Sequence, residues 1–180
     1  MSPLDIIQKY YHPESPIYKI LVSHSMAVAN KAQKIAENFS GQVDLNFIKK
    51  ASLLHDIGIF LTDAPEIGCH GDKPYICHGY LGREILEKEG FPKHALVCER
   101  HVGAGIDIKQ IKEKNLPLPV RNMIPQTLEE EIIAYADKFY SKEAEYNNHE
   151  KSIETIISSI KKYSPDEVER FKIWHKKFNI

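Results

Sequence analysis

Hydrophobic residues recur at helical spacing between Pro16 and Gly41. Positions three or four residues apart fall on one face of a helix, so this pattern predicts a long amphipathic helix with one buried face. The stripe consists of Ile17, Ile20, Leu21, His24, Val28, Ala32, Ile35 and Phe39. A histidine therefore interrupts a stripe that is otherwise apolar.

Start and stop signals divide the rest of the chain into further helices. Ser2-Pro3 and Asp44 precede apolar stretches and are typical helix starts. Thr127 with Glu130, and Ser164 with Glu167, have the spacing of capping boxes. Besides 16–41, the helices that we expect cover about residues 3–10, 44–55, 78–90, 92–103, 107–115, 127–140, 151–163 and 165–178.

One long segment lacks this periodicity. Residues 58–74 contain glycine and proline and predict an irregular loop, which is unusually long for a compact domain. No segment shows the alternation that is typical of a β-strand. The pattern therefore predicts an all-α fold, organised as a single domain over residues 1–180.

Three histidines and one aspartate occupy positions where these helices should face the core. His24 lies within an apolar stripe, and His55, His101 and Asp137 each follow an apolar residue by four positions. A histidine there is commonly a hydrogen-bonded core residue, but an ionised Asp137 without a counter-charge would cost several kcal/mol to bury. Lys138 points about 100° away around the helix. A metal cation would supply the charge and accept the imidazoles as ligands, so the set predicts a metal site.

A second aspartate, Asp56, directly follows His55. An isolated His on one helix, a His-Asp pair ending the next and an Asp on a late helix resemble the HD-domain metal-dependent phosphohydrolases. The string Ala-Ser-Leu-Leu-His-Asp-Ile-Gly at 51–58 is similar to the family's core motif. The resemblance covers residues 22–141 and implies an HD-type helical bundle, with 150–178 as a C-terminal extension of open role.

His78 and His101 match two further histidines in HD-domain members that hold two metal ions. The resemblance thus implies one ion on His24, His55, Asp56 and Asp137, and a second ion on Asp56, His78 and His101. A helix start explains His78 equally well, and a solvent-facing position would explain His101. Such mixed nitrogen and oxygen ligands suit iron, manganese or zinc and fit calcium poorly.

The resemblance also implies hydrolysis of a small phosphorylated compound, such as a nucleotide, with Asp56 at the catalytic centre. Two divalent ions would leave an excess of positive charge for the phosphate and lower the pKa of a water molecule. His70 is a candidate acid, and the candidate phosphate contacts are Lys73, Arg83, Arg100 and Lys138. Arg83 is preferred among these, although it falls about 140° from the direction of His78 around the helix. A surface position explains each cation equally well.

Two departures from the family keep the reaction open. Ile59-Phe60-Leu61 follow the His-Asp pair where many phosphohydrolases place a Lys or another polar residue, and the Gly-Tyr-Pro motif of cyclic-dinucleotide phosphodiesterases is absent. Some HD-fold proteins with the same six ligands hold a mixed-valence di-iron centre and oxidise small organophosphonates or polyols, which is the alternative. A binding module that has lost its metals is a third hypothesis, and the presence of every ligand argues against it.

Composition sets limits on partners and location. The 180 residues include 24 Lys and Arg against 25 Asp and Glu, which gives no argument for a nucleic-acid polymer or a membrane as partner. No targeting signal or membrane span is recognisable, and three cysteines form no disulfide framework, so we expect a cytoplasmic protein of open oligomeric state. Free thiols are expected rather than a structural zinc site, which would need Cys69, His70, Cys77 and His78.

Overall fold

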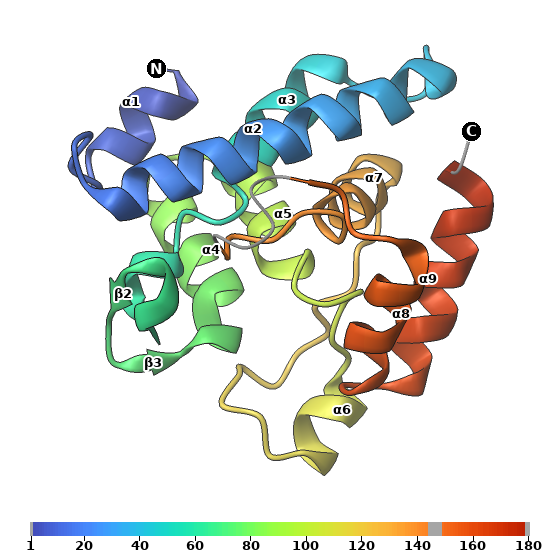
Figure 1. Ribbon diagram of the computed structural model, residues 1–180. Coiled ribbons are helices and arrows are strands. Elements are labelled where there is room, and N and C mark those ends of the chain that lie inside the picture. Colours follow the sequence, from blue (N-terminus) through green and yellow to red (C-terminus); the bar gives the residue numbers. More distant parts are fainter. Residues whose placement is uncertain (1, 144–148, 179–180) are drawn as a thin grey trace.

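Helices form most of the structure, and their first turns carry the caps that the sequence supplies. The computed structural model describes residues 2–143 and 149–178 (Figure 1). Ser2, Ser15 and Asp44 accept hydrogen bonds from first-turn amides of α1, α2 and α3. The α-helices are α1 (Pro3–Gln8), α2 (Pro16–Ala36), α3 (Leu45–Leu54), α4 (His78–Lys88), α5 (Pro92–Arg100), α6 (Ile108–Glu113), α7 (Leu128–Asp137), α8 (Ile153–Lys161) and α9 (Pro165–Phe178). Each lies within a range that helical periodicity predicts, so the all-α class is confirmed.

The last helix does not form the capping box that its sequence spacing suggests. Thr127 caps α7 as expected, and Ser164 Oγ accepts a hydrogen bond from the Asp166 amide at 3.2 Å. The carboxylate of Glu167 instead accepts a 2.9 Å hydrogen bond from the distant Ala104 amide. A tertiary partner has therefore replaced the local one.

The expected irregular loop at 58–74 contains a small three-stranded sheet, so the prediction that no strand forms was wrong. The strands are β1 (Thr62–Ala64), β2 (Cys69–His70) and β3 (Lys73–Pro74). β1 is central and pairs antiparallel with β2 and parallel with β3. Short 3₁₀ turns are η1 (Glu37–Phe39), η2 (Ile59–Leu61), η3 (Pro65–Ile67) and η4 (Tyr75–Cys77). Strands of two or three residues are too short to show the alternation on which sequence recognition depends.

The helices pack in pairs around one end of α7. Figure 1 shows α2 and α3 side by side, with α4 and α5 below them and α8 and α9 beyond α7. Each amphipathic helix buries its apolar stripe against these neighbours, as its spacing predicts. No helix in the described part of the chain combines the length and apolarity needed to cross a bilayer.

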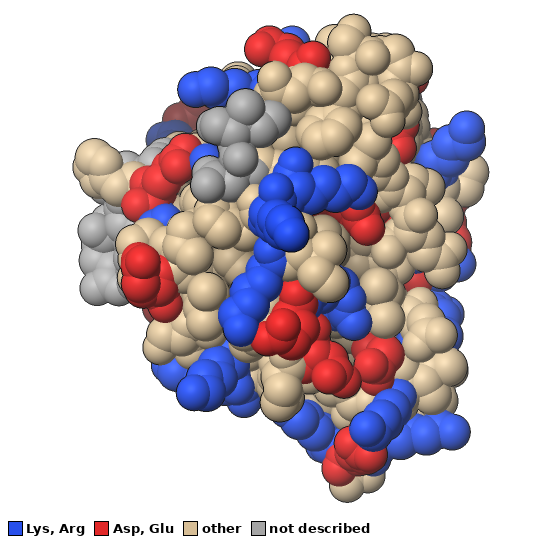
Figure 2. All heavy atoms as spheres, turned by 90° about the vertical axis from the view of Figure 1, so that its right-hand side faces the viewer, with Lys and Arg blue, Asp and Glu red and all other residues tan. Residues whose placement is uncertain are grey.

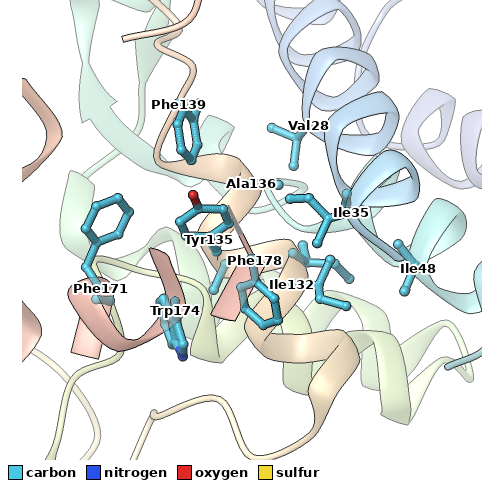
Figure 3. Close-up of a cluster of buried hydrophobic side chains, with 14 of the residues drawn as sticks. Val28, Ile35, Ile48, Ile132, Tyr135, Ala136, Phe139, Phe171, Trp174 and Phe178 are labelled. Carbon is cyan, nitrogen blue, oxygen red and sulfur yellow. The ribbon is translucent and has the colours of Figure 1, made fainter. Parts of the chain in front are cut away.

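The C-terminal helices belong to the main hydrophobic core rather than to a separate unit. Tyr135 of α7 stacks on Phe171 of α9 with ring centroids 5.5 Å apart, and Phe178 lies at the same distance from Tyr135 (Figure 3). Ile156 and Ile160 of α8 complete the same cluster. Helices α8 and α9 therefore belong to the same hydrophobic core as α2 and α7.

A glycine permits the turn after α3 to approach α4 closely. A Cβ atom on Gly58 would lie 2.3 Å from the His78 carbonyl oxygen and 2.5 Å from the Gly82 amide nitrogen. Any side chain at this position would force the two segments apart. The approach matters because Asp56 lies in that turn and His78 begins α4.

Candidate metal centre

Four buried polar side chains from separate parts of the chain meet beside the core. His24 projects from the middle of α2, His55 and Asp56 follow the end of α3, and Asp137 ends α7. The Nε2 atoms of His24 and His55 lie 3.2 and 2.9 Å from Asp56 Oδ2, and 2.9 and 3.3 Å from Asp137 Oδ1. One ligand atom from each residue lies within 4.8 Å of all the others. We call these four residues the first ligand group.

Asp56 faces a second set of ligands through its other oxygen. His78 begins α4 and His101 follows α5, and their Nε2 atoms lie 3.3 and 3.4 Å from Asp56 Oδ1. The two Nε2 atoms are 3.2 Å apart. Asp56, His78 and His101 form the second ligand group, so the structure brings all six expected ligands together in two groups that share one carboxylate.

Backbone hydrogen bonds fix which nitrogen of each imidazole faces the centre. In His55, His78 and His101, Nδ1 lies 2.6 to 2.7 Å from the carbonyl oxygen three residues earlier. A carbonyl oxygen only accepts, so Nδ1 carries the hydrogen and a neutral ring presents the lone pair of Nε2. This is the arrangement that orients histidines bound to metals.

These lone pairs fit a cation between them. The Nε2 atoms of His78 and His101 face each other at 3.2 Å as two acceptors, which repel unless a positive charge lies between them. Oδ1 of Asp56 receives no hydrogen bond from the described residues, although the side chain is fully buried. Acceptors without donors, converging from imidazole and carboxylate, form a donor set suited to a divalent transition metal.

Both carboxylates of the first ligand group are ionised in spite of their burial. Burial opposes ionisation of Asp56, but the positive charges of His55 and Lys142 hold its pKa well below the usual range. Burial also opposes ionisation of Asp137, and Lys138 is the strongest influence that lowers its pKa. Both carboxylates are therefore charged at neutral pH.

The pKa values of the histidines in the two groups are shifted in opposite directions. Burial lowers the pKa of His55, but Asp56 and Asp137 together overcome this and raise it to about 9. Burial lowers the pKa of His78 to about 3 and also lowers that of His101. The second group therefore offers neutral imidazoles, ready to bind a metal, over the whole physiological range of pH.

A cavity of about 510 Å³ adjoins both groups. Its lining combines polar and apolar side chains, among them His78, His101, Asp137, Lys142, Ile156 and Ile160. On the face shown in Figure 2, Lys and Arg side chains lie directly beside Asp and Glu side chains. The volume falls in the range of small-molecule sites.

A model of the HD domain matches residues 21–142 of the chain. The chain belongs to the HD-domain family. The resemblance drawn from the His55-Asp56 motif and its flanking ligands is therefore confirmed, and with it membership of the superfamily of metal-dependent phosphohydrolases.

Relatives of this HD domain include proteins of different lengths. It is 39% identical over 140 residues to an uncharacterised protein of Methanocaldococcus jannaschii, covering 74% of this chain and 75% of that one. It is 29% identical over 174 residues to a tRNA (cytidine(56)-2'-O)-methyltransferase of Thermoplasma volcanium and 32% identical over 123 residues to that of Picrophilus torridus. These matches cover 96% and 68% of this chain but only 44% and 32% of the methyltransferases. The chain thus spans less than half of either methyltransferase.

The same fold occurs in a bacterial phosphodiesterase. The HD domain of L. monocytogenes PgpH aligns with a TM-score of 0.55 and 20% identity, over 96% of this chain and 94% of that one. Its complex with cyclic-di-AMP aligns with a TM-score of 0.55 and 19% identity, over 94% and 92%. At this level of identity the likeness concerns the fold.

Two lysines change the charge argument made from the sequence. Lys138 was expected to point away from Asp137, but its Nζ lies 2.8 Å from Asp137 Oδ2. Lys138 is the C-cap of α7 and keeps helical backbone angles (φ −61°, ψ −23°), so the expectation was wrong because its long flexible side chain, and not the helix geometry, places the ammonium. Lys142 was not anticipated, and its Nζ lies 2.5 Å from Asp56 Oδ2. Lys142 lies outside the helices, so helical periodicity does not predict its direction. The sequence offered only its positive charge and its position shortly after Asp137 as a signal.

Four of the five candidate substrate contacts lie away from the cavity, whereas the fifth, Lys138, lines it. His70 is exposed on β2, and Lys73 is exposed and pairs with Asp72 at 3.6 Å. Arg83 donates to buried Glu99 at 2.6 Å and to Glu87 at 2.8 Å, and Arg100 pairs with Glu130 at 2.9 Å. None of the four lines the cavity, so we do not carry their expected roles further.

The cysteines do not assemble with the histidines that a zinc site would require. Cys69 and Cys77 are buried free thiols, and Cys77 donates to the Pro117 carbonyl at 3.3 Å. Within 2–143 and 149–178, the residues that converge at metal-binding spacing are those of the two ligand groups. The cysteines thus remain outside the chemistry.

Proposed function

We propose that this HD domain is a metal-dependent phosphohydrolase that acts on a small phosphorylated compound at a binuclear centre. His24, His55, Asp56 and Asp137 would hold one divalent ion, and Asp56, His78 and His101 would hold the other. Iron, manganese and zinc suit these ligands.

One observation carries the proposal. Asp56 directs Oδ2 toward His24 and His55 and Oδ1 toward His78 and His101, with every one of these contacts between 2.9 and 3.4 Å. A carboxylate that presents one oxygen to each of two ligand groups is suited to bridge two cations. Both groups adjoin the same cavity, which supports a substrate acted on by both ions.

The ligand residues would balance the charge of the metal ions, and the cavity would limit the size of the substrate. When bound, two divalent ions would withdraw charge from the phosphoryl oxygens and lower the pKa of a water molecule toward neutrality. The neutral rings of His78 and His101 add no further positive charge, and Asp56 and Asp137 balance part of the ionic charge. The 510 Å³ cavity favours a compound of nucleotide size over a polymer.

The relatives guide the choice of substrates to test. The PgpH domain is described in complex with cyclic-di-AMP, and the longer relatives are tRNA methyltransferases. A panel should therefore contain nucleoside mono-, di- and triphosphates, nucleoside 2'- and 3'-phosphates, cyclic dinucleotides and sugar phosphates.

Metal content and phosphate release test the proposal directly. Protein purified without oxygen should contain about two transition-metal ions per chain and hydrolyse at least one class of compound, seen as release of phosphate from a monoester or anhydride or as conversion of a cyclic dinucleotide to its linear form. Asp56→Ala should abolish both while retaining a helical circular dichroism spectrum, and Asp72→Ala serves as an exposed control. Oxygen uptake together with the spin signal of a mixed-valence iron pair, without phosphate release, would instead support the di-iron oxygenase. A folded protein that binds no metal would refute both.

A further inference from the structure

Each carboxylate of the first ligand group has a lysine beside it, but the two lysines are held differently. Lys138 Nζ lies 2.8 Å from Asp137 Oδ2 and also donates to the His101 carbonyl at 3.2 Å. Lys142 Nζ lies 2.5 Å from Asp56 Oδ2. The first lysine is thus anchored by the backbone as well as by a carboxylate.

The oxygen that each lysine contacts decides whether it interferes with a metal ion. The Nε2 atoms of His24 and His55 approach Asp137 through Oδ1, and Lys138 lies on the other oxygen, Oδ2. The same two Nε2 atoms approach Asp56 through Oδ2, at 3.2 and 2.9 Å. Lys142 contacts this same Oδ2. A metal ion in the first ligand group would therefore compete with Lys142 for one oxygen, and would leave Lys138 undisturbed.

The cavity provides space for the Lys142 side chain when it leaves Asp56. Its side chain is 11% exposed and lines the 510 Å³ cavity, together with His78, His101 and Asp137. Its Nζ lies 5.9 Å from the centroid of the Tyr75 ring, at the same wall. The four-carbon stem of a lysine is flexible enough to reorient its charge without moving the backbone.

We propose that Lys142 is an exchangeable counter-ion that neutralises Asp56 until a metal ion replaces it, and that it then turns into the cavity to bind a phosphoryl group. The charge of Asp56 is thus balanced in both states, first by an ammonium and then by a divalent ion. The second half rests on the proposed function, since it supposes a phosphorylated substrate.

Metal affinity tests the competition without relying on catalysis. Chelator-stripped protein is titrated with Mn²⁺, and the dissociation constant of the first ion is measured by competition with an indicator. Lys142→Met should bind Mn²⁺ at least about tenfold more tightly than the natural protein, because its competitor is gone. Lys142→Arg retains the charge and should remain close to the natural affinity. Lys138→Met is the matched control: it removes an equal charge from the oxygen that His24 and His55 do not approach, and should tighten binding much less than Lys142→Met.

Equal or weaker Mn²⁺ binding by a folded Lys142→Met variant would overturn the inference. A measurement on the natural chain covers the case in which the variant does not fold. Acetylation of lysines with an amine-reactive ester, read by mass spectrometry, should increase at Lys142 when Mn²⁺ is added, while exposed Lys73 stays constant. No increase at saturating Mn²⁺ would overturn the exchange.

Inorganic phosphate tests the second half. In the Mn²⁺-loaded protein, phosphate should again protect Lys142 from acetylation, and Lys142→Met should weaken phosphate binding about tenfold. Absence of both effects would refute the phosphoryl contact. If Lys142 responds to Mn²⁺ and to inorganic phosphate but no compound is hydrolysed, the proposed function fails alone. If compounds are hydrolysed but Lys142 does not respond, only this inference fails.

Discussion

The two ligand groups share Asp56 but differ in how their buried polar atoms are compensated. The first group contains both carboxylates, and each is balanced by a lysine, Lys138 or Lys142. The second group adds only His78 and His101, whose Nε2 lone pairs oppose each other at 3.2 Å. The first group is therefore compensated by the chain itself, whereas the second has no compensating donor among the described residues. The comparison teaches that the second group, and not the buried charge of Asp137, is the stronger indication of a bound cation.

The largest expected effect comes from removing the residue that the groups share. Asp56→Asn keeps the shape of the side chain but withdraws the charge from both groups, so we expect the affinity for each ion to fall at least about 100-fold. Metal analysis after dialysis at a fixed free metal concentration measures the loss. Asp72→Asn changes an exposed acid that pairs with Lys73, and should leave the metal content unchanged. Retention of one tightly bound ion by Asp56→Asn would show that the groups are independent.

The spacing between the groups depends on Gly58. Gly58→Ala places a Cβ atom 2.3 Å from the His78 carbonyl oxygen, so the turn that carries Asp56 must move away from α4. We expect the free energy of unfolding to fall by about 1–3 kcal/mol and the second ion to bind more weakly. Urea unfolding of metal-free protein and metal titration measure the two effects. Gly90→Asn is the control, because Gly90 has a positive φ but no neighbouring atom within 4 Å of an added Cβ.

Loss of one histidine should separate the groups. His101→Asn removes a ligand of the second group only, so we expect the metal content to fall to about one ion per chain while the first group keeps its ion. His24→Asn removes a ligand of the first group only and should leave the second ion in place. The stoichiometry at increasing metal concentration distinguishes the two. Equal loss of both ions from both variants would contradict the division into groups.

The mildest test uses pH on the metal-free protein, where the groups should act in opposite senses. The pKa of His55 is raised to about 9, so its contribution to stability is complete below about 6.5 and is lost as pH rises toward 9. The pKa of His78 is lowered to about 3, so the unfolded chain binds its proton first and stability falls as pH drops below about 6.5.

Stability should therefore be greatest near pH 6.5, with each histidine contributing a slope of at most about 1.4 kcal/mol per pH unit. Urea unfolding in the presence of chelator measures the profile. His78→Asn should flatten the acid side and leave the alkaline side unchanged. A profile whose alkaline side responds instead would contradict the assignment of these two shifts.

The sequence by itself determined the helices and the identity of the six candidate ligands. Serine and aspartate caps and the three-to-four spacing of apolar residues are local properties, and they predicted every α-helix of the described chain within its range. His24, His55, His101 and Asp137 were visible because they interrupt apolar stripes, whereas Asp56 and His78 were identified through the resemblance to the HD-domain family. These signals work because a helix fixes the direction of each side chain from its position in the sequence.

Only the tertiary structure decided how the charges are balanced and where the short strands form. Lys142 lies beyond the end of α7, where helical geometry gives no direction for a side chain, and Lys138 at the C-cap reaches Asp137 through its long flexible side chain. Glu167 accepts a hydrogen bond from the amide of Ala104, 63 residues away in the sequence, instead of capping its own helix. β1 and its neighbours are held by pairing between segments rather than by any alternation of their own. Long side chains and very short strands take their positions from partners that folding brings near, and periodicity carries no information about those partners.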